Sequence, residues 1–159
     1  GTNKQGGNAI LSKFPIQTFD QRLIQCDPGG DKWERRAQYI RVYIGYENQY
    51  LNLFHYHNTY NWHENNSASE KAGLMKYVEF VKSKSIAESE ITVLLGDFNL
   101  SKNQVDDIVD VGFYSNSYSN WVDHIYSTAV ILNSGFYDTR GNRLSDHQAV
   151  WSVICNDDC

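Results

Sequence analysis

Residues 91–99 read ITVLLGDFN, an apolar run rich in β-branched residues that ends abruptly in Gly-Asp-Phe-Asn. A short apolar run of this kind is typical of a buried strand, and the polar groups that do chemistry in α/β proteins sit where such strands end. Gly96 allows close backbone approach, while Asp97 and Asn99 offer the hard oxygen ligands that suit magnesium and phosphate. We therefore expect Asp97 and Asn99 at a cleft rim; the alternative is an Asx turn, which both residue types favour.

The composition is that of an ordinary globular domain. The 159 residues are 41% hydrophobic and 14% aromatic, enough for a core. No stretch approaches the ~18 apolar residues of a membrane span, and the first residues, GTNKQGG, lack the apolar core of a signal peptide. The net charge of -5 argues against a protein that coats nucleic acid by electrostatics alone. It still allows an enzyme whose bound metal reverses the potential of an acidic cleft.

The cysteines and one glycosylation signal bear on localisation. Cys26, Cys155 and Cys159 are an odd number of thiols, and the last two enclose the terminal CNDDC. They are either free or include a Cys155–Cys159 bridge, which requires a turn. Asn65-Asn66-Ser67 is a glycosylation sequon in a polar loop, and together with the cysteine-flanked tail it favours a secreted protein.

Alternation and turn residues predict most of the elements. Residues 36–44 and 49–57 alternate on either side of a turn and predict a hairpin, in whose second strand Leu51, Leu53, His55 and His57 share one face. Further strands are predicted at residues 7–12, 16–25, 121–127 and 149–155, and a further element of unspecified type at residues 130–136. Loops or turns are predicted at residues 27–31, 60–66, 115–120 and 138–142, with a short helix near 105–109.

One longer helix precedes the strand at residues 91–99. Its buried face is predicted from helical spacing of Leu74, Tyr77 and Val81, and Ser67 and Glu70 have capping-box spacing at its start. The order of elements predicts a strand-helix-strand connection.

Five short motifs follow one another along the chain: GNAILSKFPI at Gly7, HNT at His57, GDFN at Gly96, WVDHI at Trp121 and LSDH at Leu144. Their order, spacing and strand context closely resemble the endonuclease/exonuclease/phosphatase superfamily, the deoxyribonuclease-I-like phosphodiesterases. The resemblance implies an α/β (α+β) fold, a two-sheet β-sandwich flanked by helices, with the site at one end of the sheets.

The resemblance also implies roles for single residues. Asp97 and Asn99 match the family's metal-and-nucleophile pair in GDFN, and Asp146 and His147 match its SDH motif. Asp123, in WVDHI, matches the aspartate that orients the SDH histidine.

His57 best matches the histidine of the family's THL strand end, because the apolar residues before it have the usual length, and His55 is the reserve. His57 would donate a hydrogen bond to the phosphoryl or leaving oxygen as charge builds. His55 and His57 could instead bind zinc, since both rings lie on one strand face.

Phosphodiester hydrolysis needs a metal that neutralises phosphoryl charge, a group that orients and deprotonates water, and a donor for the leaving oxygen. Asp146 and Asp97 are the predicted ligands of Mg²⁺, with Mn²⁺ or Ca²⁺ as alternatives. Asp97 and Asn99 would also orient the water or the phosphoryl oxygen. The pair of Asp123 and His147 fixes the imidazole tautomer. Which histidine is acid and which is base stays open at this point.

Other polar and aromatic residues are better explained by structural roles or solvent exposure than by catalysis. Arg140 and Arg143 could grip a phosphate, or they are merely solvated. His63 and His124 are expected to be packed and hydrogen-bonded. The four tryptophans are expected to be core or loop aromatics rather than stacking platforms: Trp33, Trp62, Trp121 and Trp151.

The chain departs from the resemblance at its start. Family members carry an asparagine and a metal-binding glutamate upstream of the GNAILS-like strand, and Glu34 stands in a different context. Residues 1–159 are therefore expected to be the C-terminal part of a single domain, completed by an N-terminal segment or a second chain. Without it, a sheet face would be left open.

The leading functional hypothesis is a magnesium-dependent phosphodiesterase, an endonuclease that hydrolyses DNA. Alternatives within the same fold are a sphingomyelinase or an inositol-phosphate phosphatase, acting on phospholipid or inositol phosphate. A lipid substrate predicts an exposed apolar hairpin, and the sequence shows no obvious one. The alternative from another class is a non-catalytic binding module that lacks the metal glutamate.

Overall fold

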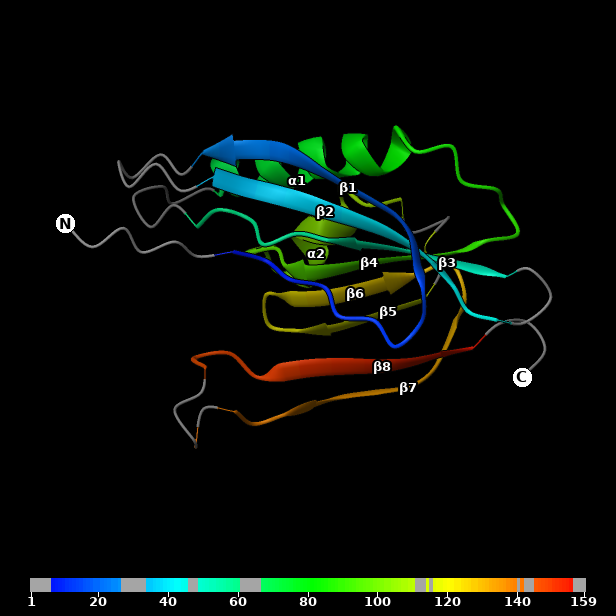
Figure 1. Cartoon of the computed structure of the whole chain (residues 1–159). Coiled ribbons are helices and arrows are strands. Elements are labelled where there is room, and N and C mark those ends of the chain that lie inside the picture. Colours follow the sequence, from blue (N-terminus) through cyan, green and yellow to red (C-terminus); the bar gives the residue numbers. More distant parts are fainter. Residues whose placement is uncertain are drawn as a thin grey trace.

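The computed structural model describes residues 7–26, 34–45, 49–60, 67–110, 114, 116–139, 141 and 145–155. Its elements, in chain order, are β1 (Ile16–Cys26), β2 (Glu34–Tyr43), β3 (Tyr50–His55), α1 (Ala68–Lys82), β4 (Ile91–Asp97), α2 (Lys102–Asp106), β5 (Asn116–Asn120), β6 (Asp123–Ser127), β7 (Val130–Tyr137) and β8 (Ala149–Cys155). The strands form a six-stranded sheet in the order β1-β2-β3-β4-β6-β5 and a two-stranded sheet of β7 and β8 (Figure 1). The predicted α/β fold, a two-sheet β-sandwich flanked by helices, is confirmed.

The strand β4 lies inside the larger sheet, where its first four residues are buried. Its neighbours are β3, which is parallel, and β6, which is antiparallel. Parallel pairing requires a crossover, and α1 supplies it between β3 and β4. The predicted strand-helix-strand connection and the predicted hairpin of β2 and β3 are therefore both present.

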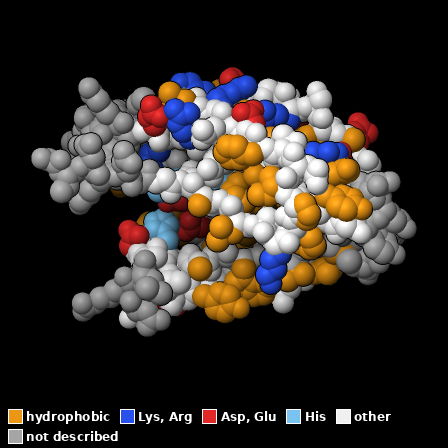
Figure 2. All heavy atoms as spheres, in the orientation of Figure 1, with side chains coloured by type: hydrophobic (Ala, Val, Ile, Leu, Met, Phe, Trp, Pro, Cys, Tyr) orange, Lys and Arg blue, Asp and Glu red, His pale blue; other side chains and the backbone are white. Residues whose placement is uncertain are grey.

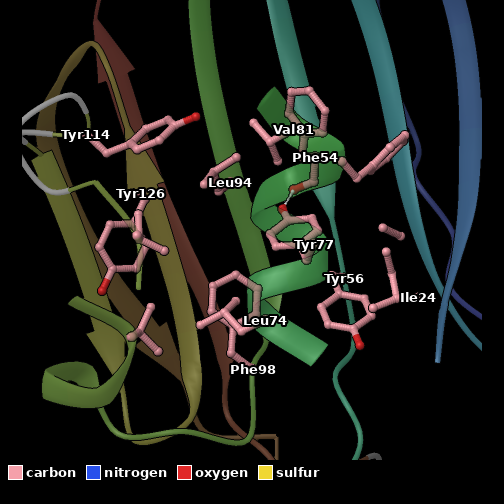
Figure 3. Packing of buried hydrophobic residues seen from close by; sticks show 14 of the residues in the cluster. Ile24, Phe54, Tyr56, Leu74, Tyr77, Val81, Leu94, Phe98, Tyr114 and Tyr126 are labelled. Atoms are coloured by element: carbon pink, nitrogen blue, oxygen red, sulfur yellow. Dashed lines mark hydrogen bonds between the residues drawn. The ribbon is translucent and has the colours of Figure 1, made fainter. Parts of the chain in front are cut away.

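Two apolar clusters cover the two faces of the large sheet. On one face, α1 packs through Tyr77 and Leu74 against strand residues such as Phe54 and Leu94 (Figure 3). The Tyr77 ring stacks on Tyr56 with centroids 5.2 Å apart, and its hydroxyl donates to the carbonyl of Phe54 at 3.0 Å. These contacts hold the end of β3, the part of the chain that leads to the candidate site, against a fully buried helix face.

On the other face, β8 approaches the sheet. Val150 and Ile154 pack against a small cluster that includes Val93 and Ile125. Burial of these side chains joins the two sheets. Cys155, at the end of β8, is disulfide-bonded, so the interpretation of all three thiols as free is wrong for this residue.

Several local predictions were wrong. Residues 7–12 form no strand: the described backbone there meets β2 through side chains, with Asn8 Nδ2 donating to Arg36 O at 3.2 Å and Gln38 Nε2 donating to Asn8 O at 3.0 Å. A strand requires a backbone ladder, and no described strand provides one here.

The predicted capping box at Ser67 and Glu70 is also absent. Ser67 has a left-handed backbone, with φ of 54°, and its side chain makes no cap hydrogen bond, while Glu70 is buried. The capping box of the described chain lies at α2, where Ser101 N donates to Gln104 Oε1 at 3.0 Å.

The segment predicted as a loop over residues 115–120 contains β5, an edge strand that pairs with β6. Its polar sequence, NSYSN, carries no alternation, so tertiary pairing overrides weak propensity. β6 correspondingly begins at Asp123, and Trp121 lies in the turn between the two strands. The turn predicted at residues 27–31 lies outside the described residues.

Among the described helices, none has the length and apolar character that crossing a membrane requires.

A partly buried ion pair links β2 to the start of β4. Glu90 accepts from Arg41 Nη2 at 2.6 Å and from Arg41 Nε at 3.1 Å, and also from Asn52 Nδ2 at 2.8 Å. Asn52 is fully buried and accepts from the Tyr39 hydroxyl at 2.8 Å. The hydrogen bonds from Arg41 and Asn52, with the arginine charge, outweigh burial and lower the pKa of Glu90 below its ordinary value of 4.5.

Glu90→Gln should lower the free energy of unfolding by about 2 kcal/mol at pH 7, because it leaves the Arg41 charge half-buried without a counter-ion. Since the folded-state pKa of Glu90 is lowered, its stabilisation is present above pH 4.5 and is lost as the pH falls through the folded pKa. Urea unfolding at pH 7 and below pH 4 checks this, and the difference between the two proteins should shrink at low pH. Glu34→Gln, which removes a surface pair with Arg36, is the control and should change stability by less than about 0.5 kcal/mol.

Candidate active site

The carboxyl end of β4 is held between its neighbours beyond the last ladder pair. Tyr56 N donates to Leu95 O at 3.1 Å, and Asn58 N donates to Asp97 O at 2.8 Å, so the chain after β3 stays beside β4. On the other side, Asp97 and Asp123 are direct cross-strand partners. Segments that are far apart in the sequence therefore deliver their polar side chains to one sheet edge.

Gly96 is required where β4 meets β3. Its φ is +148°, and a Cβ built on it would lie 1.8 Å from the carbonyl oxygen of Tyr56. No side chain fits in that space, so glycine lets the two backbones approach just before the aspartate.

Two histidines approach the Asp97 carboxylate. His57 Nε2 lies 3.4 Å and His147 Nε2 lies 3.8 Å from Asp97 Oδ2. The other ring nitrogen of His147, Nδ1, lies 2.9 Å from Asp123 Oδ2. An ionised carboxylate only accepts hydrogen bonds, so Nδ1 carries the proton and Nε2 of the neutral ring faces Asp97.

Asn99 is held in a left-handed conformation, with φ of 51°. Its backbone N–H donates to Asp97 Oδ1 at 2.9 Å, and its side-chain Nδ2 donates to the carbonyl of Asn58 at 3.2 Å. The Asx turn considered from the sequence is thus present, and it orients the Asp97 carboxylate. The hydrogen bond to Asn58 also fixes the side-chain amide of Asn99.

Asn58 is a supporting residue that the sequence reasoning missed. It is fully buried, and its Nδ2 donates to Glu70 O at 2.7 Å and to Phe98 O at 2.9 Å, while its Oδ1 accepts from the Tyr56 hydroxyl at 3.0 Å. It therefore ties the segment carrying His57 to α1 and to the segment after Asp97. The signal was present, since Asn58 is the middle residue of the HNT motif.

Burial and the close carboxylates shape the acid–base properties of the site. Burial raises the pKa of Asp97 and of Asp123, against the lowering effect of neighbouring groups. For His147, burial lowers the pKa, but the hydrogen bond that the ring donates to Asp123 and the negative charges around the ring outweigh it and raise the pKa overall. The pKa values of Asp97, Asp123 and His147 therefore depend on one another's charge.

Asp146 lies beside this cluster. Its side chain is exposed, and its charge acts on both Asp123 and His147. Its predicted role as a metal ligand stays a prediction, as do the roles of the other site residues. Arg140, Arg143 and His63 lie outside the described residues.

The remaining histidines differ from the site pair. His124 is fully buried, with Nδ1 at 2.8 Å from Ser119 Oγ and Nε2 at 2.8 Å from Leu100 O, which confirms its interpretation as a packed residue. His55 is half-buried on the cleft side of β3, and burial lowers its pKa to about 4. The described geometry pairs His57 with Asp97 and gives no support to zinc held by His55 and His57.

The site opens into a cleft between the two sheets with a volume of about 690 Å³. Strands β3, β4, β6 and β8 line it, and its walls are largely apolar away from His57, Asp97 and Asp123. Figure 2 shows histidine and acidic side chains gathered in the hollow between the upper and lower parts of the molecule.

Paired carboxylates and histidines at one end of a two-sheet α/β sandwich are the arrangement that the resemblance implies. In agreement, residues 1–147 match the model of the Endonuclease/Exonuclease/phosphatase family. The chain belongs to this family. No curated protein matches the chain.

Solved structures share the fold at low sequence identity. SmcL superimposes with a TM-score of 0.66 and 14% identity, over 80% of this chain and 57% of SmcL. A mannosyl-6-phosphatase of Bacteroides thetaiotaomicron superimposes with a TM-score of 0.54 and 13% identity, over 89% of this chain and 67% of the phosphatase chain. A humanized TDP2 of D. rerio superimposes with a TM-score of 0.58 and 15% identity, over 89% of this chain and 65% of the TDP2 chain. The chain thus spans about two thirds or less of the length of these proteins.

The family depends on divalent metals, and the described residues include a group suited to one. Single ligand atoms of Asp97, Asp123 and His147 all lie within 4.8 Å of one another. Carboxylate oxygens are the ligands that Mg²⁺ prefers, and Mg²⁺ is bound through few carboxylates because it keeps waters and substrate phosphates as its other ligands. The residues present therefore fit a hard divalent cation.

Proposed function

We propose that this protein is a magnesium-dependent phosphodiesterase that cleaves DNA as an endonuclease, with Mn²⁺ or Ca²⁺ as alternative metals. The observation that carries the proposal is the arrangement of His57, Asp97, Asp123 and His147 at one rim of the cleft, with Asn99 held beside them. These side chains offer a general base, a hydrogen-bond donor and metal-binding oxygens that can all act on the same phosphate group. The TDP2 and phosphatase neighbours share the fold that presents it.

In this proposal, different side chains accept and donate protons during hydrolysis. Asp123 holds Nδ1–H of His147, so Nε2 of His147 accepts the proton of the attacking water, and Asp97 orients that water. His57, on the other side of Asp97, donates from Nε2 to the phosphoryl or leaving oxygen as charge grows there, so that the alcohol leaves with a proton when its bond to phosphorus breaks. The Asn99 amide contributes a further hydrogen bond at the same place.

A bound divalent cation would neutralise phosphoryl charge. Asp97 and Asp146 are the ligands that we propose, and single ligand atoms of Asp123 and His147 lie within 4.8 Å of one of Asp97. Because the chain is acidic, with a net charge of -5, the cation would also offset the repulsion of a phosphate by the carboxylates.

The test is hydrolysis by the purified protein, with Mg²⁺ or with chelator, of four substrates: supercoiled plasmid, sphingomyelin vesicles, an inositol phosphate and bis(p-nitrophenyl) phosphate. We expect metal-dependent nicking of the plasmid. Hydrolysis of the lipid or the inositol phosphate in its place would replace the DNA assignment while keeping the chemistry. No hydrolysis of any substrate would favour the binding-module alternative.

A lipid substrate is the second candidate, because the structure contains the exposed apolar hairpin that the sequence did not reveal. On β7 and β8 five large hydrophobic side chains are between 46% and 66% exposed: Val130, Leu132, Phe136, Tyr137 and Val153. Figure 2 shows hydrophobic side chains along this lower part of the molecule. Exposed apolar patches mark contacts with lipids or proteins. Sedimentation with sphingomyelin vesicles, lost in Leu132→Asp, would support this candidate, and no sedimentation would reject it.

We further propose that a segment beyond these 159 residues, N-terminal to them, completes the domain. Buried polar atoms on both sheets lack partners within the described part of the chain: Gln38 Oε1, His55 Nδ1 and Ser152 Oγ. Leu11 is 96% exposed, and the cleft is apolar. The 159 residues alone should bind the dye ANS through this cleft, and Leu53→Asp should weaken the binding. A chain that binds no dye and melts cooperatively would contradict the proposal.

Secretion is also a proposal. The disulfide of Cys155 supports it, since disulfides persist in oxidising compartments. Expression behind an added secretion signal in a glycosylating host tests it: a mobility shift that glycosidase reverses and Asn65→Gln abolishes is expected, and secretion of an unmodified protein whose Cys155 thiol is free would contradict it.

A further inference from the structure

Trp121 occupies an unusual position for a tryptophan. It lies in the turn between β5 and β6, its side chain is 75% exposed, and its φ is +58°. Tryptophan is usually well buried, and a bulky residue in the left-handed region is strained. Burial does not account for a tryptophan here, and residues held against their preferences cluster where ligands bind.

The exposed ring lies directly beside the candidate active site. Its centroid is 5.5 Å from that of the His147 imidazole, with the ring planes at 39°. The turn itself is fastened on the same side, because Asn120 Nδ2 donates to Gln148 Oε1 at 2.7 Å, next to His147. Trp121 is therefore fixed at the rim of the site rather than projecting at random into solvent.

The chemistry around Trp121 differs from that of the phosphate position. His147, Asp97 and Asp123 offer hydrogen bonds and charge, whereas Trp121 offers a flat apolar surface immediately outside them. A ligand that reaches both must carry a planar or apolar group close to its phosphate. In DNA that group is a base, and stacking on an aromatic side chain tolerates any base.

We propose that Trp121, expected from the sequence to be only a core or loop aromatic, is a stacking platform for the base next to the scissile phosphate wherever that base is unpaired, in the plasmid as in a single strand. The assignment rests on the proposed nuclease function. It predicts little preference for base identity but a requirement for a base at the stacking position. A lipid substrate would offer an apolar chain to Trp121 and no base, so dependence on a base at the stacking position would distinguish the two candidate functions.

The test uses Trp121→Asn, because asparagine tolerates a left-handed backbone and removes the ring without adding strain. Trp121→Phe keeps a smaller ring. Substrates are one labelled single-stranded oligonucleotide and a series in which each base in turn is replaced by an abasic site, with cleavage at every bond resolved on a gel. Phe19→Ala is the matched control: Phe19 is 57% exposed on β1, at the opposite edge of the sheet from the β5–β6 turn.

For the intact oligonucleotide, Trp121→Asn should raise KM about tenfold while kcat changes by less than about threefold, and Trp121→Phe should restore most of the loss. In the wild type, an abasic site next to a bond should weaken cleavage of that bond. In Trp121→Asn, the abasic site should make no further difference.

Three results would overturn the inference. A fall in kcat alone, equal on intact and abasic DNA, would make Trp121 a residue that only positions His147. An unchanged KM would show that the ring contacts no substrate. A wild-type protein that nicks plasmid but neither cleaves nor binds the oligonucleotide would refute the stacking role alone, and one that hydrolyses bis(p-nitrophenyl) phosphate but acts on neither DNA would refute the DNA assignment as well.

Discussion

His147→Ala should reduce the metal-dependent kcat about 10³-fold while the protein stays folded. The imidazole Nε2 that faces Asp97 would be lost, and with it the group that takes the proton of the attacking water. The ring is at the rim of the cleft and only partly buried, so its removal leaves the two apolar clusters intact. Steady-state rates with the preferred substrate, together with circular dichroism, measure both effects.

Asp123→Asn is the companion to this variant. It removes the carboxylate that holds Nδ1–H of His147, so it should lower kcat through the tautomer of the ring, and the double variant should be little worse than His147→Ala. Asp20→Asn, which breaks only a surface pair with Lys84, is the control and should keep full activity. Activity of His147→Ala within tenfold of wild type would remove His147 from the mechanism.

Gly96→Ala should have the largest effect on stability. The added Cβ would meet the Tyr56 carbonyl oxygen at 1.8 Å, and the backbone φ of +148° is one that alanine rarely adopts. Strand β4 would have to move away from β3 in the middle of the sheet, which should cost at least about 3 kcal/mol or prevent folding. Urea unfolding of the two proteins measures the difference in free energy.

Gly7→Ala is the matched control for this substitution, because its Cβ would meet no atom within 4 Å. It should leave the unfolding midpoint where it is. If Gly96→Ala unfolded within about 1 kcal/mol of wild type, the close approach of β3 and β4 at the site would be wrong.

The sequence could predict these parts of the fold because their patterns are local. The apolar run of β4 fits the interior of a sheet, the alternation of β2 and β3 fits a hairpin, and β8 begins and ends as predicted. The pairing of Asp123 with His147 followed from the resemblance, and the structure brings the two side chains together at 2.9 Å.

Other features depend on contacts between distant segments, which no local pattern encodes. β5 is a strand only because β6 pairs with it, and residues 7–12 are not a strand because no described ladder receives them. The role of Asn58 arises from three segments that meet only in the folded chain. The sequence of β7 does not show which of its hydrophobic side chains are exposed, so the apolar hairpin could be recognised only in the structure.

The central claim is that Asp97, with its neighbours, forms one metal-dependent catalytic site. Calorimetric titration with Mg²⁺ tests it most directly, using the wild type, Asp97→Asn and the surface control Asp20→Asn. We predict one saturable site in the wild type and in Asp20→Asn, with the affinity reduced at least about tenfold in Asp97→Asn. Identical isotherms for all three proteins, or no binding by the wild type, would contradict the account and favour a scaffold that binds without catalysis.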